Sequence, residues 1–494
     1  MDPIKPKINL ATLLTPTVGE DHLGIKYVAI NIADLLQPGI TSVTRRARYW
    51  SFYAWVLYDF INTSSEKNPL FIKSLENFKN YLKRQECYFI CANIAMQVKY
   101  GYNIDGLQGV TLMQEIWNES TNFIVCHTDY LQNSFGGYSI YRNVMKTTGV
   151  TDSEDNENGI FIDCLRRLGQ ELAIAFESEI CETEYYKKYR HSSENIPKSV
   201  LIEFGKKAAL QFSRDAKDLP ILKSIFVPYG EKYKTCRRAQ SIMFYKYALE
   251  KHPDKISSRK FWAQIFYDVY SPKGEIRETI PEEFKEVALG WEIFQARQLF
   301  TYGLEGIWSF VLKQLMDQPL SRRELFQKVI NLSEPIKMDS LVRDLINDMP
   351  ISMLQREKDI NEIGNNGEKT IISALRLMLD VRMRFFQRND LNTFHEELLL
   401  NGSRKNLSLH VWFQTVDYHA DKTIEDILLF IFNQYIINQH INTTMDKLLN
   451  TGNITFHLEE DEGLLHFKIE DHPAFNVYRT IQAVSIAKDL SIID

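Results

Sequence analysis

Residues Asn31–Asn62 read NIADLLQPGITSVTRRARYWSFYAWVLYDFIN, and this stretch decides the fold. Pro38-Gly39 marks a turn in its first half. From Tyr49 to Ile61 only Ser51 and Asp59 are polar. A helix that is apolar on every side must be covered on every side, so the sequence predicts a buried central helix here. The run is too short to span a bilayer, which needs about 20 apolar residues.

The size and composition are those of a globular protein. A length of 494 residues predicts about three domains, at roughly 150 residues each. The chain is 44% hydrophobic and 25% charged, as in ordinary globular proteins, and 12% of it is aromatic, so rings must fill much of the core. A net charge of −6 argues against a protein coated in basic surface, such as a histone-like DNA packager, but leaves room for a local basic site.

The cysteines and the first residues indicate a cytoplasmic protein. The six cysteines form no C-x-x-C pair and lie outside the last half of the chain, a pattern that fits reduced thiols better than a disulfide framework. The opening MDPIKPKINLATLL lacks the long apolar core and the cleavage site of a signal peptide. No stretch is long enough for a transmembrane helix, so we expect no membrane association.

Hydrophobic periodicity predicts a mainly α-helical, multi-domain protein with small β-hairpins. The expected parts are an N-terminal helical domain (1–181), a charged linker (182–198), a central helical domain (199–395) and a C-terminal helical domain with a β-hairpin (396–494).

Four local patterns in the second half of the chain predict particular elements. The run from Pro281 through Leu312 predicts one very long helix, which Gly303 and Gly306 could bend or split. Ser321 with Glu324 predicts a capping box. The last hundred residues predict a hairpin and a final helix, with the strands at Ile454–Leu458 and Leu464–Ile469 and the helix at Val477–Asp489.

Residues 134–178 form the most patterned unit. A helical run over Tyr138–Thr148 is followed by the acidic turn TDSEDNENG, a short apolar segment and an amphipathic helix. Helix, hairpin and helix in this order are typical of a winged helix-turn-helix. The alternative, a helical domain with one acidic loop, is favoured because topology is seldom recovered from one sequence.

Catalytic signatures are mostly absent. The chain contains no P-loop, no G-x-G-x-x-G, no G-x-S-x-G and no H-E-x-x-H motif, and its eleven histidines show no ligand spacing, so no metal site or cofactor is predicted. Asp268 followed by Glu283 and Lys285 has the residue order of a metal-dependent nuclease. Those sites place the second carboxylate and the lysine on one face of a strand, whereas a helix start is predicted here.

Two basic clusters are candidates for nucleic-acid contacts. The first adjoins Tyr49 and Trp50, whose rings could stack on bases, and the second lies near the helix, hairpin and helix unit. The alternative for the first cluster is that its arginines start a buried helix and pair with acidic residues, and the hydrophobicity that follows favours it. The candidate residues are Arg45, Arg46 and Arg48 in the first cluster, and Lys146, Arg166 and Arg167 in the second.

Several short motifs are spread over most of the chain. They are Leu23-Gly24, Ala33-Asp34-Leu35-Leu36, Pro38-Gly39-Ile40-Thr41, Arg46-Ala47-Arg48-Tyr49, Gly136-Gly137-Tyr138, Phe294-Gln295-Ala296-Arg297-Gln298, Trp308-Ser309-Phe310 and Gln439-His440. In these motifs the chain resembles a family of largely uncharacterised bacterial proteins that are encoded in anti-phage defence islands. The resemblance implies a cytosolic component of a multi-gene immunity module, working with an ATPase or nuclease partner encoded nearby. The family has no assigned catalytic residues, so none is carried over.

These observations together favour a non-enzymatic accessory or scaffold subunit of a prokaryotic anti-phage defence system. Such a subunit would contact partner proteins and could also contact nucleic acid. Two alternatives stay open. One is a DNA- or RNA-binding sensor that uses residues 134–178 and the nearby arginines, and the other is a stand-alone effector with a cryptic nuclease-type site.

Overall fold

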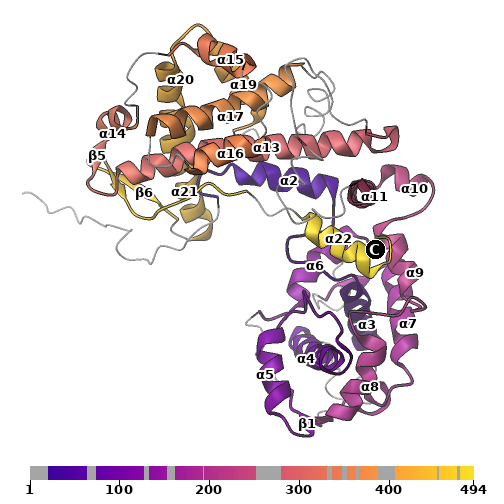
Figure 1. Ribbon diagram of the computed structural model, residues 1–494. Helices are drawn as coiled ribbons and strands as arrows, with labels where there is room; N and C mark the ends of the chain where they lie inside the picture. The colour runs from indigo at the N-terminus through magenta and orange to yellow at the C-terminus, as the bar shows by residue number, and fades with distance from the viewer. Residues whose placement is uncertain are drawn as a thin grey trace, which may run out of the picture. The chain divides into compact units, whose positions relative to one another are not determined.

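The structure is a computed structural model. It describes residues 21–63, 74–126, 133–152, 162–192, 194–251, 267, 280–330, 336–347, 353–362, 367–387, 407–452, 455–475 and 479–493. These residues are mainly helical and include small antiparallel sheets of two or three strands, which confirms the predicted fold class (Figure 1). Of the helices that the structure describes, not one combines the length and the apolar run needed to cross a bilayer.

The chain divides into two compact units, and each unit joins segments that lie far apart in the sequence. Unit 1 comprises Met1–Ala33 and Asp254–Val477, and unit 2 comprises Asp34–Pro253 and Tyr478–Asp494. The expected domains, by contrast, followed the chain in order. The last helix illustrates the difference, because the C-terminal residues pack against α11 of unit 2.

Unit 2 is built from helices with two small two-stranded sheets, β1 with β4 and β2 with β3. Its elements are α3 (Arg48–Asn62), α4 (Leu75–Tyr100), α5 (Val110–Glu119), β1 (Phe123–Ile124), α6 (Tyr138–Thr147), β2 (Thr151–Asp152), β3 (Cys164–Leu165), α7 (Arg167–Ile180), η2 (Tyr185–Tyr189), β4 (Ile196–Pro197), α8 (Lys198–Ala208), α9 (Leu219–Phe226), α10 (Glu231–Thr235), α11 (Arg237–Lys251) and α22 (Thr480–Asp489).

Helix α3 is the centre of unit 2, as the sequence predicts. It contacts α4, α6, α7 and α9, and the side chains of Trp50, Phe52 and Trp55 are fully buried. Its core is made of rings in contact, for example Phe52 stacked on Phe89 with centroids 4.0 Å apart. Because neighbours cover every face of α3, its all-round hydrophobicity is satisfied within the unit.

The helix, hairpin and helix order predicted for residues 134–178 is present as α6, the β2–β3 pair and α7. Residues 153–161, which include most of the expected acidic turn, lie outside the described residues. Helix α7 buries Leu172 and Phe176 and packs along α3, so its apolar face belongs to the core of unit 2. The segment expected as a linker contains η2 and β4 and buries Tyr185.

Unit 1 holds the other helices and a three-stranded sheet in the order β5-β7-β6. Helix α2 (Lys26–Leu36) begins in unit 1 and crosses into unit 2. The remaining elements are η4 (Glu282–Phe284), α13 (Lys285–Gln314), β5 (Leu320–Ser321), α14 (Arg322–Val329), α15 (Met338–Asn347), α16 (Met353–Glu362), α17 (Gly367–Gln387), α19 (Leu409–Tyr418), α20 (Ile424–Phe430), η5 (Ile431–Ile437), α21 (Asn438–Thr451), β6 (Leu458–Asp461) and β7 (Leu464–Phe467).

Helix α13 is the long helix predicted from Pro281 onward, and it continues unbroken through both glycines. It is buried over almost all of Val287–Leu312 and packs mainly on α17. A Cβ on Gly303 would lie 3.0 Å from the carbonyl oxygen of Ala374 and 2.9 Å from Cγ of Met378. Gly303 therefore serves close packing of the two helices rather than a bend.

The predicted hairpin and capping box are present, with one shift of register. Ser321 and Glu324 form the complete capping box of α14. The first strand of the hairpin runs over Leu458–Asp461, whereas Ile454–Leu458 was predicted, so Glu459, Glu460 and Asp461 lie in the strand and Glu462 lies in the turn. The reason is the turn, because Glu462 and Gly463 both adopt positive φ (50° and 81°) and make a two-residue connection. The final helix runs over Thr480–Asp489, and Val477, its predicted start, lies outside the described residues.

Candidate metal centre

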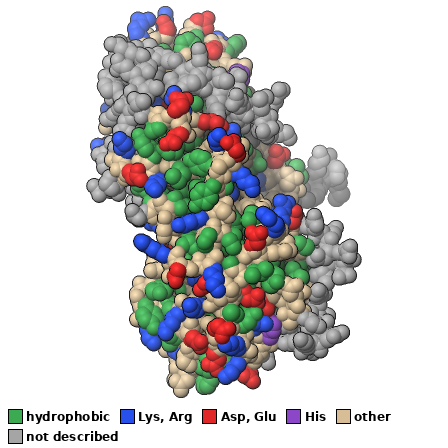
Figure 2. Space-filling view, turned by 90° about the vertical axis from the view of Figure 1, so that its right-hand side faces the viewer, with side chains coloured by type: hydrophobic (Ala, Val, Ile, Leu, Met, Phe, Trp, Pro, Cys, Tyr) green, Lys and Arg blue, Asp and Glu red, His purple; other side chains and the backbone are tan. Residues whose placement is uncertain are grey.

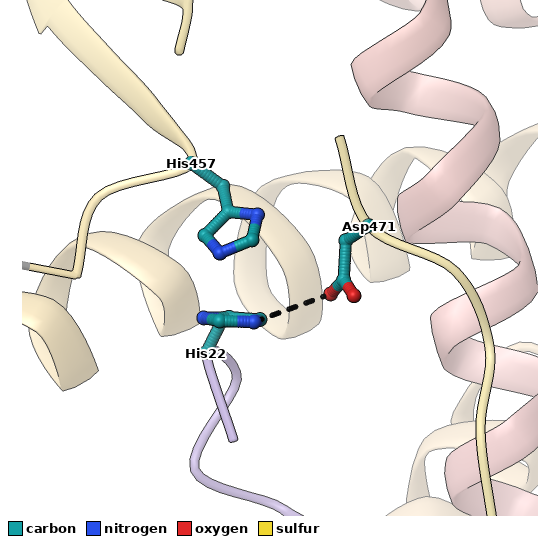
Figure 3. A group of neighbouring side chains, drawn as sticks. All are labelled: His22, His457 and Asp471. Atoms are coloured by element: carbon teal, nitrogen blue, oxygen red, sulfur yellow. Dashed lines mark ion pairs between the residues drawn. The ribbon is translucent and has the colours of Figure 1, made fainter. Parts of the chain in front are cut away.

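Three chain segments of unit 1 bring two histidines and an aspartate together. His22 lies in the turn before α2, His457 directly precedes β6, and Asp471 follows β7. Figure 3 shows the three side chains pointing toward one another, with the Asp471 carboxylate beside the His22 ring. The hairpin accounts for the arrangement, because it returns the chain from His457 to Asp471 on the same side of unit 1.

The donor atoms are close and shielded from water. Nε2 of His22 lies 3.6 Å from Oδ2 of Asp471, and the centroids of the two imidazole rings lie 3.5 Å apart. One ligand atom from each of the three residues lies within 4.8 Å of the others. His22 is 7% exposed and His457 is 1% exposed. The cluster is therefore an interior site rather than a surface group of polar residues.

A third histidine holds the backbone around this cluster. Nδ1 of His440 lies 3.2 Å from the carbonyl oxygen of His22, and its Nε2 accepts a hydrogen bond of 3.2 Å from the backbone N–H of His457. These contacts require a neutral ring with the proton on Nδ1. Because both nitrogens of His440 are occupied, this ring positions His22 and His457 and offers no free donor atom.

The carboxylate of Asp471 is also fixed in place. The indole Nε1 of Trp308 donates to its Oδ2 at 3.0 Å, and the backbone N–H of His472 donates to its Oδ1 at 2.9 Å. Trp308 stands on α13 and packs against the ring of His440, with centroids 4.7 Å apart. The long buried helix thus orients the acidic member of the cluster.

Burial keeps the imidazoles neutral. It lowers the pKa of His22 to about 2 and that of His440 to about 3, and the neighbouring histidines add to both shifts. Burial also lowers the pKa of His457. Nδ1 of His22 and both ring nitrogens of His457 are buried without a hydrogen bond of normal geometry. Neutral imidazole nitrogens without partners are the form in which histidine binds a metal ion.

A groove of about 860 Å³ lies next to the turn that carries His22. Its lining includes Asp21, Gly24 and Tyr27 from that turn and the start of α2, together with Asn442 and Lys447 from α21. The ammonium group of Lys447 donates to the carbonyl oxygen of Asp21 at 2.7 Å. The groove and the histidine cluster are therefore two features of the same part of unit 1.

The arginines of the first basic cluster are mostly interior. The Nε of Arg46 lies 3.0 Å from Asp489, and its Nη1 donates to the carbonyl oxygen of Asn103 at 2.8 Å. Arg48 pairs with Asp218 in a fully buried site. Arg45 alone of the three is exposed. Two of these three charges are thus neutralised inside unit 2.

The second basic cluster is also paired with carboxylates. Nζ of Lys146 lies 3.0 Å from the buried Asp163. Arg166 forms an ion pair with Asp152 on the neighbouring strand β2. Arg167, whose side chain is 86% exposed, lies 3.6 Å from Glu171. On the face drawn in Figure 2, basic and acidic side chains are interspersed rather than gathered by sign.

The nuclease-like pattern is only partly described. Asp268 lies outside the described residues, and Glu283 stands in the short 3-10 turn η4, directly before α13. Lys285, the first residue of α13, forms an ion pair with Glu282. Glu283 and Lys285 are therefore in a helix start and not on a strand, as the sequence predicts.

Sequence reasoning did not single out His22, His457 or Asp471. The first two stand 435 positions apart (457 − 22), so no spacing motif could join them. Comparisons with protein-family models, with curated protein sequences and with solved structures give no significant match. The geometry of the chain itself is therefore what defines this site.

Proposed function

We propose that this chain is a non-enzymatic scaffold subunit of a bacterial anti-phage defence system that acts through protein partners. The observation that supports the proposal best is that basic residues of the predicted clusters pair with carboxylates of the same unit. Arg46, Arg48 and Lys146 pair with carboxylates within unit 2, so these three residues of the predicted basic clusters leave little positive charge on the described surface for a nucleic acid. The resemblance of its motifs to proteins of defence islands supplies the biological context.

The proposal places the chain in the cytoplasm, beside an ATPase or nuclease encoded nearby. None of the six cysteines, all of which lie in the described residues, forms a disulfide, as expected for a reducing compartment. A mainly helical body with a ring-filled core also suits a rigid subunit that presents surfaces to partners.

A pull-down from the native host tests the proposal. The tagged chain is recovered at moderate salt, and the eluate is analysed by mass spectrometry and by its absorbance ratio. Recovery of a neighbouring gene product in stoichiometric amount is the expected result, and the tag alone is the control. Nuclease or nucleotide-hydrolysing activity of the purified chain on its own would overturn the scaffold function.

A second candidate function is a nucleic-acid-binding sensor, which the exposure of Arg45 and Arg167 favours. Binding through phosphates predicts an affinity that falls steeply with salt and that weakens in the Arg166→Ala, Arg167→Ala variant. Lys187→Ala, Lys188→Ala is the matched control, since it removes two exposed charges elsewhere in unit 2. Absence of binding at low salt would end this candidate.

A further inference from the structure

We infer that His22, His457 and Asp471 bind a divalent transition-metal ion, and that Zn²⁺ best matches this set of two imidazoles and one carboxylate. Zinc takes nitrogen ligands from histidine and oxygen ligands from aspartate, whereas Mg²⁺ and Ca²⁺ prefer sites made of oxygen alone. The inference goes beyond the scaffold function and does not depend on it.

The distances suit an ion after small side-chain rotations. Zinc–ligand bonds of roughly 2.0–2.1 Å in a tetrahedral arrangement put the ligand atoms about 3.4 Å from one another. Nε2 of His22 and Oδ2 of Asp471 are already 3.6 Å apart. One ligand atom from each of the three residues lies within 4.8 Å of the others, so an ion would draw the donors closer together.

The unpaired nitrogens are the second observation that points to a ligand. Buried polar atoms are nearly always hydrogen-bonded, because leaving one unpaired costs its desolvation free energy. Here Nδ1 of His22 is buried without a hydrogen-bond partner, and the almost fully buried His457 interacts with the backbone of Ile469 and Glu470 but makes no ring hydrogen bond of normal geometry. A bound ion would use one nitrogen from each ring.

The surroundings are those of a supported metal site. Residues that hold the ligands in orientation are a regular feature of such sites, and their loss weakens metal binding. Trp308 and the backbone of His472 fix both oxygens of Asp471, and His440 holds the backbone of both histidines. The carboxylate is therefore oriented toward the imidazoles without help from an ion.

Two lysines near the cluster oppose a cation, but both have partners. Nζ of Lys26 lies 2.8 Å from Oε1 of Glu305, and Lys447 donates to the carbonyl oxygen of Asp21. The Lys26 ammonium is thus paired with Glu305, and Asp471 is the acidic residue of the cluster itself that faces the ion. An ion here would join the turn before α2 to both ends of the hairpin, which the sequence separates by more than 400 residues.

Titration of the stripped protein with Zn²⁺ alone tests the inference. The full-length chain is freed of metal with a chelator and followed by calorimetry, and Co²⁺ absorption then reports the coordination geometry. We expect saturable binding of one Zn²⁺ ion per chain, and a higher Tm of the protein when the ion is bound. Asp471→Asn preserves the shape of the side chain and should weaken binding by about 100-fold or more, whereas Trp308→Phe should weaken it by about tenfold or more.

His472→Ala is the matched control, because it removes an exposed neighbouring imidazole and leaves the backbone N–H that holds Asp471. It should bind Zn²⁺ like the wild type. His457→Ala should lose saturable binding, and far-UV circular dichroism checks that it folds. A stripped wild-type chain without saturable Zn²⁺ binding would overturn the inference whatever the variants do. Equal binding by His457→Ala and the wild type would overturn it as well, since the ion would then sit on surface groups.

Discussion

Replacing Arg48 by methionine should destabilise unit 2 strongly, because it leaves a buried carboxylate alone. The Nε of Arg48 donates to Oδ2 of Asp218 at 3.2 Å, and its Nη1 donates to the carbonyl oxygen of Ala209 at 2.8 Å. The guanidinium also lies over the rings of Phe176 and Phe212, 5.3 Å and 4.9 Å from their centroids. Arg48 is 2% exposed and Asp218 is 0% exposed, so water cannot replace the lost partner.

The expected loss follows from this burial. Removing one partner of a buried ion pair costs about 3–5 kcal/mol in the free energy of unfolding, whereas replacing both partners with apolar residues is often close to neutral. The Arg48→Met, Asp218→Leu double variant should therefore lie within about 2 kcal/mol of the wild type. Asp218 precedes α9 but makes no side-chain cap, so its removal forfeits no capping bond.

Urea unfolding measures these differences. Tryptophan fluorescence reports the transition near α3, which carries Trp50 and Trp55, and far-UV circular dichroism reports the helices. Arg167→Gln is the control, because its exposed side chain should change stability by no more than about 0.5 kcal/mol.

The outcome separates a structural arginine from a binding one. Should Arg48→Met lose less than about 1 kcal/mol, or should the double variant lose as much as the single one, the argument from burial is wrong. Arg48 would then be free for the nucleic-acid contact that the sequence also allows.

Three further predictions concern packing, pH and capping. Gly169→Ala should lower the free energy of unfolding by about 3 kcal/mol or more, because the new Cβ would lie 2.2 Å from the carbonyl oxygen of Val150. Gly149→Ala has open space around it but a strained φ of 76°, so it should lower the free energy of unfolding by only about 1–2 kcal/mol in the same urea assay. Burial raises the pKa of Glu305 to about 7, although the Lys26 ammonium opposes the shift. The folded state therefore keeps a proton that the unfolded state releases near pH 4.5, and the stabilisation from this proton is lost as the pH rises from about 4.5 through 7. Between pH 5 and pH 8 the wild type should therefore lose about 2–3 kcal/mol relative to Glu305→Gln, and parallel stability–pH curves would contradict the assignment. Ser321→Ala removes the capping box of α14 and should cost about 1 kcal/mol in thermal unfolding.

Local patterns predicted much of the fold. The uniform hydrophobicity of Tyr49–Ile61 predicted the buried helix α3, and the run from Pro281 through Leu312 predicted the long helix α13. Ser321 and Glu324 fixed a helix start, because a capping box depends only on neighbours in the chain. The hairpin was also predicted, but its register was not. The turn at Glu462-Gly463 depends on positive backbone angles, which the run of acidic residues does not indicate.

The sequence by itself determined the elements that depend on nearby residues: the all-round hydrophobic helices, their caps and the mainly helical class. Tertiary structure alone decided the long-range partners. It paired Arg46 with Asp489 and Arg48 with Asp218, and it brought His22 to His457 and Asp471. Such pairings depend on how distant segments share one core, and no periodicity or spacing in a single sequence records that. The charge of a side chain is local, but its partner is set by the fold.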